Sequence, residues 1–396
     1  MRAAVGVAVV GLAAGAVASA TGSHTKVSTS PIPAAPPTTY PLPAHAWLVR
    51  TGAQLQRALD RQRAQNIVLA DGVYALPTGL HFVDSNGSGL YAQHLGGAVL
   101  TTGLEVGGNG SVNGAVVQGL AFDVSNPANV FQSAEIHAWG SAGQNLKVLD
   151  STFEGNDVIP LGLRSLEPQG LTARRLVFRH FTDVALTEST NVPVPYGTPT
   201  PAARVISDIS VDGVTRAVPG SSDGTAEAGL WIGEPVRYGV HRIRVRNVAI
   251  SGIETCNNAF NTTFTDLDID MTGPSASAGV GVYLEHFSRH LVFQRFRITG
   301  ASSGFKAEWD DGTAGNGAAH FTTIANGVID AQGWTRGRTV GVMLDVGTES
   351  TTITGVTFRN QTFAGINAFR TLGPNLFKGN AYELPAGVPR ISSGHR

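Results

Sequence analysis

The chain has little of what many folds use for covalent or electrostatic stability. Its 396 residues include one cysteine, three methionines and four lysines, and charged residues make up 14%. A single cysteine excludes an intrachain disulfide framework, so packing must hold the fold together. The formal net charge is −1, which argues against nucleic acid as a partner, because domains that bind it are usually strongly basic.

Long hydrophobic runs are missing beyond the first twenty residues. Nothing later approaches the roughly 18 consecutive apolar residues of a membrane span, so we expect no span in the mature chain. Residues 1–20 combine Arg2, a run of small apolar residues and Ala18-Ser-Ala20, which is the pattern of a cleavable signal peptide. The alternative is an uncleaved membrane anchor. We therefore expect an exported, extracytoplasmic protein.

Threonine, serine and proline are concentrated in residues 21–46, and this composition predicts an extended linker. The folded domain is expected to occupy residues 47–396. It opens with Thr51-Gly-Ala-Gln54, a capping box that predicts a short helix. Residues 66–74 then read as strand, turn and strand. A helix in front of a stack of strands would cover the exposed end of that stack.

Glycine is plentiful, with 49 residues, and a loose repeat begins near residue 79. Each unit has one strand ending in an apolar residue, such as Leu171–Phe178. A glycine-led strand follows, such as Gly281–His286 or Gly304–Trp309. Unequal spacing between units predicts stacked rungs with variable loops. The units are too short for crossover helices, so consecutive strands should stack as a parallel coil. The main alternative is an antiparallel sandwich.

The chain resembles the right-handed parallel β-helix proteins of the pectate lyase-like superfamily. The resemblance is carried by Thr51–Leu59 leading to Ile67–Tyr74, and by rungs such as Gly341-Val-Met-Leu-Asp345. It covers about residues 47–380 and is architectural, so no catalytic residue is carried over from it. It implies an all-β fold, a right-handed parallel β-helix (solenoid) with a short N-terminal capping helix.

Aligning the glycine-led strands sorts their side chains into inward and outward columns. The first inward column is apolar and reads Val158, Val184, Leu230, Ile253, Val282, Phe305, Val342 and Ile366. The first outward column is Ile159, Ala185, Trp231, Glu254, Tyr283, Lys306, Met343 and Asn367. The second is Leu161, Thr187, Gly233, Cys256, Glu285, Glu308, Asp345 and Phe369. The middle of both outward columns is acidic and aromatic.

Aromatic rings with nearby carboxylates suit sugars, because rings stack on apolar sugar faces and carboxylates carry out acid–base chemistry. We therefore predict a polysaccharide-cleaving groove with Glu285 and Glu308 as acid and base or nucleophile, and Glu254 and Asp345 as alternates. Lys306 would be an electrostatic partner of the substrate or the carboxylates. The predicted substrate-binding residues are Trp231, Tyr283, Trp309, His286, Glu234 and Glu188.

Strand spacing suggests the stereochemistry. Neighbouring strands would hold Glu285 and Glu308 about 5 Å apart, near the separation in retaining glycosidases. Glu285 and Asp345, two rungs apart, would be about 9.5 Å apart, at the upper edge of the inverting range. Carboxylates outnumber basic groups in the columns, which slightly favours a glycoside hydrolase over a polysaccharide lyase.

The acidic columns allow other interpretations. They could form a solvated face with ordinary ion pairs. We expect no cofactor, with calcium as the alternative, held by Glu285, Glu308, Asp345, Asp310 and Asp311. Cys256 is expected to be a free thiol. The second functional hypothesis is a non-catalytic glycan-binding or cell-surface β-helix protein, because this scaffold hosts both kinds of function.

Overall fold

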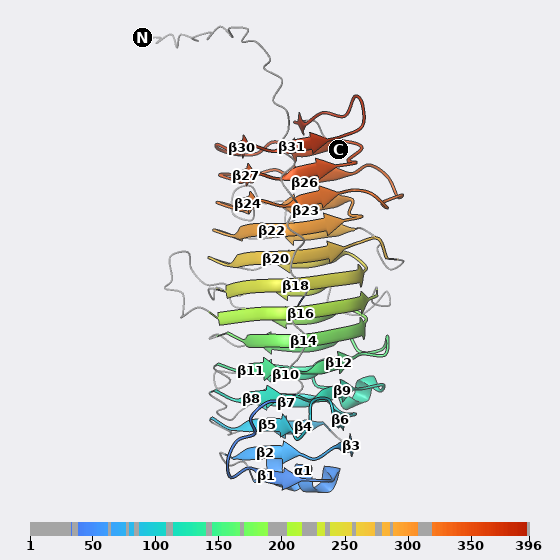
Figure 1. Ribbon diagram of the computed structural model, residues 1–396, viewed down its shortest axis with the longest axis vertical. Helices are drawn as coiled ribbons and strands as arrows, with labels where there is room; N and C mark the ends of the chain where they lie inside the picture. The colour runs from blue at the N-terminus through green and yellow to red at the C-terminus, as the bar shows by residue number, and fades with distance from the viewer. Residues whose placement is uncertain are drawn as a thin grey trace, which may run out of the picture.

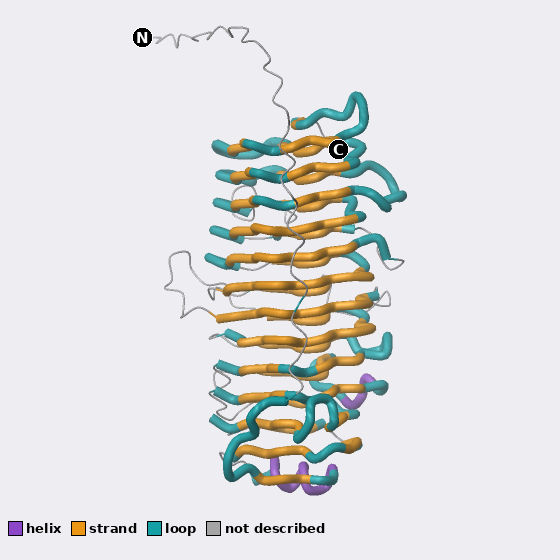
Figure 2. Tube along the Cα trace, viewed as in Figure 1, coloured by secondary structure: helices purple, strands orange, loops and turns teal. Residues whose placement is uncertain are grey.

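The structure is a computed structural model. It describes residues 33, 39–61, 65–76, 79–82, 87–107, 114–139, 145–166, 170–188, 204–215, 228–233, 238–255, 259–273, 279–285, 288–307 and 319–393. These residues coil into a right-handed parallel β-helix whose strands lie in successive layers along one axis (Figures 1 and 2). The predicted fold class is confirmed. In the described part of the chain, no helix has the length and apolar character needed to cross a membrane.

The N-terminal end of the coil is built as predicted. Strand β1 (Trp47–Val49) precedes helix α1 (Gly52–Leu59), and β2 (Asn66–Leu69) and β3 (Gly72–Tyr74) follow. The hydroxyl of Thr51 accepts a hydrogen bond of 3.2 Å from the Gln54 amide and caps the helix. The apolar side of α1 is buried, and the helix lies beside β1 at the end of the stack (Figure 1).

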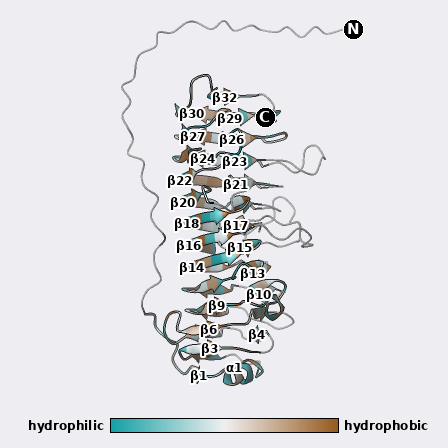
Figure 3. Ribbon diagram, turned by 90° about the vertical axis from the view of Figure 1, so that its right-hand side faces the viewer, coloured by the Kyte–Doolittle hydropathy of each residue, from teal (hydrophilic) through white to brown (hydrophobic). Residues whose placement is uncertain are grey.

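The strands form two parallel sheets, which lie on opposite sides of the coil (Figure 3). Within the described residues the larger, sheet A, has 20 strands, and the smaller, sheet B, has 12. Besides β1, β2 and β3, sheet A contains β5 (Gly89–Ala92), β6 (Ala98–Leu100), β8 (Val116–Gln118), β9 (Ala121–Asp123), β11 (Lys147–Leu149), β12 (Thr152–Glu154), β14 (Thr172–Phe181), β16 (Arg204–Val214), β18 (Tyr238–Val248), β20 (Thr263–Asp270), β22 (Val292–Thr299), β24 (Thr323–Ala325), β25 (Val328–Asp330), β27 (Thr352–Thr354), β28 (Thr357–Arg359), β30 (Leu376–Lys378) and β31 (Ala381–Glu383).

Sheet B contains the glycine-led strands of the sequence repeat. Its members are β4 (Leu80–Phe82), β7 (Leu104–Gly107), β10 (Ala134–Trp139), β13 (Leu161–Leu166), β15 (Val184–Glu188), β17 (Ala228–Ile232), β19 (Ser251–Thr255), β21 (Val280–Leu284), β23 (Ser303–Ala307), β26 (Val340–Leu344), β29 (Ala364–Ala368) and β32 (Ile391–Ser392). A short 3-10 helix, η1 (Pro127–Asn129), precedes β10.

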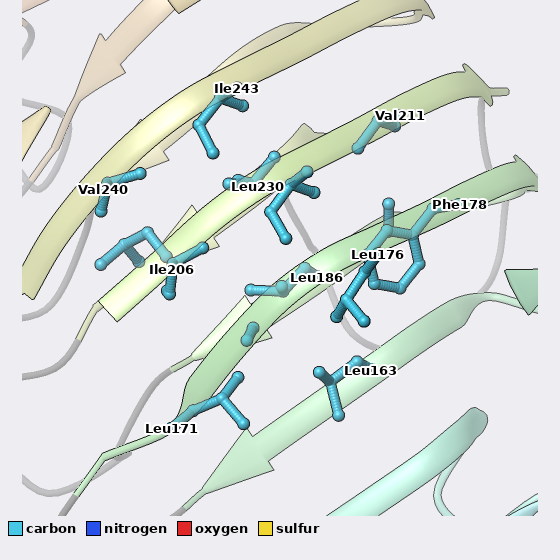
Figure 4. Packing of buried hydrophobic residues seen from close by; sticks show 14 of the residues in the cluster. Leu163, Leu171, Leu176, Phe178, Leu186, Ile206, Val211, Leu230, Val240 and Ile243 are labelled. Atoms are coloured by element: carbon cyan, nitrogen blue, oxygen red, sulfur yellow. The ribbon is translucent and has the colours of Figure 1, made fainter. Parts of the chain in front are cut away.

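The core lies between the sheets and is made of stacked like residues. Leu163, Leu186 and Leu230 of sheet B lie opposite side chains of β14, β16 and β18 (Figure 4). Within sheet A, the ring of Phe153 stacks 5.0 Å from Phe122 and 4.6 Å from Phe178. Each turn therefore buries its apolar side chains against the turns above and below it, as expected for a solenoid.

The repeated glycine of sheet B is required by this packing. A Cβ atom at Gly281 would lie 2.5 Å from the Cγ2 atom of Ile298 and 2.6 Å from the carbonyl oxygen of Gly304. Gly252 and Gly304 face isoleucines of sheet A at the same distances, within 0.1 Å. The glycine column lets side chains of sheet A reach the backbone of sheet B, so a side chain at Gly252, Gly281 or Gly304 would be overpacked.

The predicted columns are displaced in the two earliest rungs. Val184 pairs with Ala228, and Leu186 pairs with Leu230, so this rung was aligned two residues out of register. The rung before it is β13, which begins at Leu161, so the predicted Val158, Ile159 and Pro160 precede the strand. Val158 is 41% exposed, whereas Ile159 is buried in the core.

Glycine explains the displacement. In β15 the glycine position is occupied by Ala185, which is buried in the core and not outward as predicted. In β13 the position belongs to Gly162, whose added Cβ would meet the ring of Phe178 at 2.6 Å. The sequence alignment relied on the leading glycine, so it could not place β15, where alanine occupies that position. For β13 it started at Val158 and not at the glycine position, Gly162.

Candidate active site

One line of side chains runs along sheet B on the face turned away from the core. Strand register places in this line His81, Glu105, His137, Arg164, Thr187, Trp231, Glu254, Tyr283, Lys306, Met343 and Asn367. We call it the outward row. The flanking residues of the same strands, such as Val282 and Leu284, belong to the core. From Trp231 to Asn367 the row matches the predicted column residue by residue.

A pair of carboxyl groups lies at the centre of the outward row. Glu254 on β19 is 3% exposed, and its side chain is hydrogen-bonded to that of Glu285. The Ser251 hydroxyl donates a 3.2 Å hydrogen bond to Oε2 of Glu254. Glu285 follows β21 directly, and its amide donates to the carbonyl of Thr255 at 2.8 Å. The parallel ladder thus brings the two carboxyls together from adjacent strands.

The environment of Glu254 favours its protonated form. Burial is the largest cause, and the charge of Glu285 is the second; together they raise the pKa of Glu254 well above its ordinary value. Asp183 adds a further contribution in the same direction, and the hydrogen bond from Ser251 opposes it. Two adjacent carboxyls cannot both ionise without strong repulsion. The pair therefore keeps one proton at pH values where an exposed glutamate has lost it.

Aromatic and cationic groups flank the pair. Register places Trp231 beside Glu254 on one side and Tyr283 on the other. Trp231 packs against the buried side chains of Leu161 and Val184, and its indole nitrogen has no hydrogen-bond partner. The Nζ atom of Lys306 lies 5.1 Å from the centroid of the Tyr283 ring. This order of ring, acid, ring and cation suits a sugar chain lying along the row.

Asp345 lies further along the same face. Its amide donates to the carbonyl of Ala307 at 3.0 Å, and its Oδ1 accepts from the Val346 amide at 2.8 Å. Asp345 therefore follows β26 as Glu285 follows β21, with β23 between them. Two strand spacings separate the two backbone positions, about 9.5 Å.

The structure thus brings together five predicted site residues and places a sixth two strands away from Glu285. The five are Trp231, Glu254, Tyr283, Glu285 and Lys306, and the sixth is Asp345. Other predictions fall outside the described residues: Glu234, Cys256, His286, Glu308, Trp309, Asp310 and Asp311. The partner that the structure shows for Glu285 is Glu254, which the sequence offered as an alternate, and pairing with Glu308 stays a prediction.

The prediction that Glu188 binds substrate is wrong. Strand register aligns it with Ile232, and its side chain is fully buried. The hydroxyl of Tyr238 donates to its Oε1 at 2.5 Å and accepts from the Leu171 amide at 2.8 Å. Burial raises the pKa of Glu188 to about 8. Its alignment with Ile232 places this acid in the interior of the coil, and the sequence alignment missed this because that rung was two residues out of register.

Sequence reasoning missed the N-terminal part of the outward row. His81, Glu105 and Arg164 went unnoticed, and His137 was not placed in a column. The signal was present, because Gly162-Leu-Arg-Ser repeats the pattern of Gly229-Leu-Trp-Ile. In the structure Nδ1 of His81 lies 2.5 Å from Oε2 of Glu105. Burial lowers the pKa of His137 to about 4, and the charge of Arg164 adds to this.

No metal site is evident in the part of the chain that the structure describes. There, no three side chains of His, Cys, Asp or Glu are grouped as ligands for a metal ion. Three members of the predicted calcium set, Glu308, Asp310 and Asp311, lie outside the described residues. Calcium therefore stays an alternative to the expected absence of a cofactor.

Comparison with known proteins supports the fold and gives no family. No protein-family model matches the chain, and no curated protein matches it by sequence. Among solved structures it is similar to the A-module of the mannuronan C-5 epimerase AlgE6 of Azotobacter vinelandii. The identity is 13%, the match covers 87% of this chain and 95% of the epimerase module, and the TM-score is 0.54.

Two further structures have the same architecture. The catalytic domain of a GH87 α-1,3-glucanase in complex with nigerose is similar to this chain, with 11% identity and a TM-score of 0.55. The match covers 91% of this chain and 70% of the glucanase chain. A PL6 alginate lyase in complex with a trisaccharide matches with 12% identity, 89% of each chain and a TM-score of 0.51. At such identities the likeness concerns the fold alone, and it confirms the resemblance to pectate lyase-like parallel β-helix proteins.

Proposed function

We propose that this protein is an exported carbohydrate-active enzyme that cleaves a polysaccharide on the outward face of sheet B. The observation that carries the proposal is the hydrogen bond between the buried Glu254 and the half-buried Glu285, with the rings of Trp231 and Tyr283 beside Glu254. The names of the three similar structures support it, since each acts on a polysaccharide. Export rests on the leader-like pattern of residues 1–20.

In the proposed reaction Glu254 is the general acid. It donates its proton to the glycosidic oxygen as the bond from that oxygen to the anomeric carbon breaks. Glu285, ionised, stabilises the positive charge that develops on the sugar, and attacks the anomeric carbon. Water then hydrolyses the glycosyl ester, with Glu254 accepting the proton from that water.

Direct contact between the two carboxyls favours this retaining course, because an inverting enzyme needs roughly 6.5–9.5 Å between its carboxyl groups. The pair of Glu285 and Asp345, two strands apart, is the arrangement that would suit inversion. The anomeric form of the first product, followed by proton NMR, separates the two. A product that retains its configuration supports Glu254 and Glu285, and inversion would transfer the role of base to Asp345.

The remaining residues would position the substrate. Trp231 and Tyr283 offer ring faces to successive sugars. Lys306, held against Tyr283, would attract a carboxylate or hydroxyl of the substrate.

The experiment is a screen of the full chain against neutral glucans and uronic-acid polysaccharides, with and without a chelator. New reducing ends are measured for the wild-type protein, Glu254→Gln and Glu285→Gln. Glu383→Gln is the matched control, since Glu383 pairs with Arg359 on sheet A. Cleavage by wild type and control, lost in both site variants, is the expected result. Undiminished cleavage by either site variant contradicts the assignment.

A lyase is the second candidate, and the contact between Lys306 and Tyr283 favours it. A lyase abstracts the proton beside a uronate carboxylate and expels the glycosidic oxygen, which leaves an unsaturated sugar that absorbs ultraviolet light. Absorbance that rises with the new reducing ends would identify this reaction. Binding without any cleavage would instead favour the non-catalytic glycan-binding hypothesis, and loss of cleavage with chelator would support the calcium alternative.

A further inference from the structure

The N-terminal part of the outward row holds a polar group that lacks the contacts it needs. His137 on β10 is 3% exposed, and neither of its ring nitrogens has a hydrogen-bond partner. A buried imidazole without partners costs free energy, since it has lost its hydrogen bonds to water. Such groups are few in native proteins, so each one calls for a functional or structural explanation.

The neighbour of His137 in the row is a cation. Register pairs His137 with Arg164 on β13. Within the described residues, the contact found for Arg164 is a long hydrogen bond of 3.4 Å from its Nη1 to the carbonyl oxygen of Gln132. Its guanidinium has no carboxylate partner there, whereas Arg175, Arg242 and Arg295 on sheet A are all paired with aspartates.

The nearest acid of the row is already engaged. Oε2 of Glu105 lies 2.5 Å from Nδ1 of His81, and Oε1 accepts a hydrogen bond of 2.6 Å from the indole of Trp139. Both carboxylate oxygens are thus committed to other groups. The positive charge of Arg164 is therefore available to an anion from outside.

An aromatic surface adjoins this charge. Trp139 is 36% exposed, and its ring stacks on that of His137 with 6.2 Å between centroids and 16° between planes. The hydrogen bond to Glu105 holds the indole in place. A fixed, partly exposed indole beside an arginine combines an apolar platform with an anion-binding group, which is what an acidic sugar requires.

We propose that Trp139, His137 and Arg164 form a subsite for a uronic-acid residue of the polysaccharide. This inference rests on the proposed function, because the same sugar chain would reach the pair of Glu254 and Glu285. Arg164 and Glu254 lie three strands apart in the row, which corresponds to about 14 Å. The guanidinium binds the carboxylate through two parallel hydrogen bonds, the imidazole N–H adds a third, and the indole covers the sugar ring.

Binding of defined oligosaccharides to the full chain tests the subsite. Isothermal titration calorimetry is done with a mannuronate hexamer, a galacturonate hexamer and an α-1,3-linked glucose hexamer. The variants are Arg164→Gln and, as control, Arg174→Gln, an exposed arginine on sheet A. We expect wild type to bind one of the two uronate hexamers. Arg164→Gln should weaken that binding roughly 10- to 100-fold, the range for hydrogen bonds to charged groups, and Arg174→Gln should leave it unchanged.

A second readout reports on His137 directly. Carbon-13 NMR of labelled histidines follows its titration, and His137→Asn identifies the signal. In the free protein its pKa is lowered to about 4. A bound carboxylate beside the imidazole favours the charged form, so the titration should move to higher pH when the uronate hexamer is added.

Three results would overturn the subsite. They are wild-type binding of neither uronate hexamer, equal binding of the uronate and glucose hexamers, and an Arg164→Gln variant that binds a uronate hexamer as wild type does. The failure of the proposed function looks different. In that case no polysaccharide is cleaved, while uronate binding and its loss in Arg164→Gln persist.

Discussion

Two buried glutamates on neighbouring parts of sheet B have the same electrostatic signature and opposite surroundings. Glu254 lies on the outward face, where its neighbours are another carboxyl group, two aromatic rings and a lysine. Glu188 lies in the interior, where Tyr238 donates to it and links it to the backbone at Leu171. Burial is the largest cause of the raised pKa in both.

The difference between them teaches how to identify a catalytic acid in this fold. A raised pKa follows from burial alone, and an interior acid has it without access to substrate. What sets Glu254 apart is a second carboxyl group on the next strand and its place in a row turned away from the core. A neighbouring carboxyl group and a position on the outward face of sheet B therefore identify the candidate acid.

The largest effect is expected from a substitution on the outward face, at Glu285. Glu285→Gln removes the proposed nucleophile beside Glu254, and the rate of polysaccharide cleavage should fall by at least about 10²-fold, the lower end of what even one acid–base group contributes. The charge that helps to raise the pKa of Glu254 also disappears. Because a general acid works only while protonated, the alkaline limb of the residual activity should move to lower pH. Initial rates across pH measure both effects.

Glu383→Gln again provides the control, and the melting temperature of each variant shows whether the fold is intact. Residual activity with an unchanged alkaline limb would show that Glu285 does not act on Glu254. The two glutamates would then be separate groups and not a coupled pair.

On the interior side, Glu188 should control stability and not activity. Its pKa is raised from 4.5 to about 8, so the folded protein holds a proton that the unfolded chain releases above about pH 4.5. This contribution to stability is complete below that pH and is lost as the pH rises to about 8. The slope from this group is at most about 1.4 kcal/mol per pH unit. Urea unfolding from pH 5 to pH 8 measures it.

Glu188→Gln keeps an acceptor for Tyr238 and cannot ionise. We expect the stability of this variant to decline less steeply between pH 5 and pH 8, by up to about 1.4 kcal/mol per pH unit, and its cleavage rate to equal that of wild type. An undiminished decline would mean that other groups cause it. A large loss of cleavage with intact stability would place Glu188 in the catalytic machinery. It would contradict the distinction drawn between the interior Glu188 and the outward Glu254.

The smallest effect concerns the glycine column behind the site. Gly281→Ala forces a methyl group against Ile298 and the backbone of Gly304, and overpacking of this kind costs about 1–3 kcal/mol. Ala185→Gly is the matched variant, since that rung already holds a Cβ atom at the same position, and we expect a loss of no more than about 1 kcal/mol. Denaturant midpoints compare them. A Gly281→Ala variant as stable as wild type would show that the sheets can separate there.

Much of the fold could be predicted because the inside of a coil imposes one rule on every rung. Val282, Phe305 and Val342 occupy equivalent interior places, so each must be apolar, and the glycine before each must leave room for sheet A. Local rules also held at the N-terminus, where Thr51 caps the helix as expected. Repetition made these positions recognisable.

The outward row was predictable only where the rungs carry the glycine that aligns them. Trp231, Glu254, Tyr283 and Lys306 follow such glycines and were placed correctly. Glu188 and Arg164 belong to rungs where the glycine is replaced or was overlooked, and the first was misplaced and the second missed. Outward side chains are not constrained by packing, so they give no independent check on register.

The sequence by itself determined the parallel coil, its capping helix and the acidic, aromatic centre of one face, because these follow from periodicity and composition. Tertiary structure alone decided which acids meet. Glu254 and Glu285 are separated by loops of irregular length, and the hydrogen-bonded ladder between β19 and β21 brings them together. The same ladder aligns Glu188 with Ile232 of the core, whereas the sequence alignment had placed Glu188 two residues further on, beyond the inward positions.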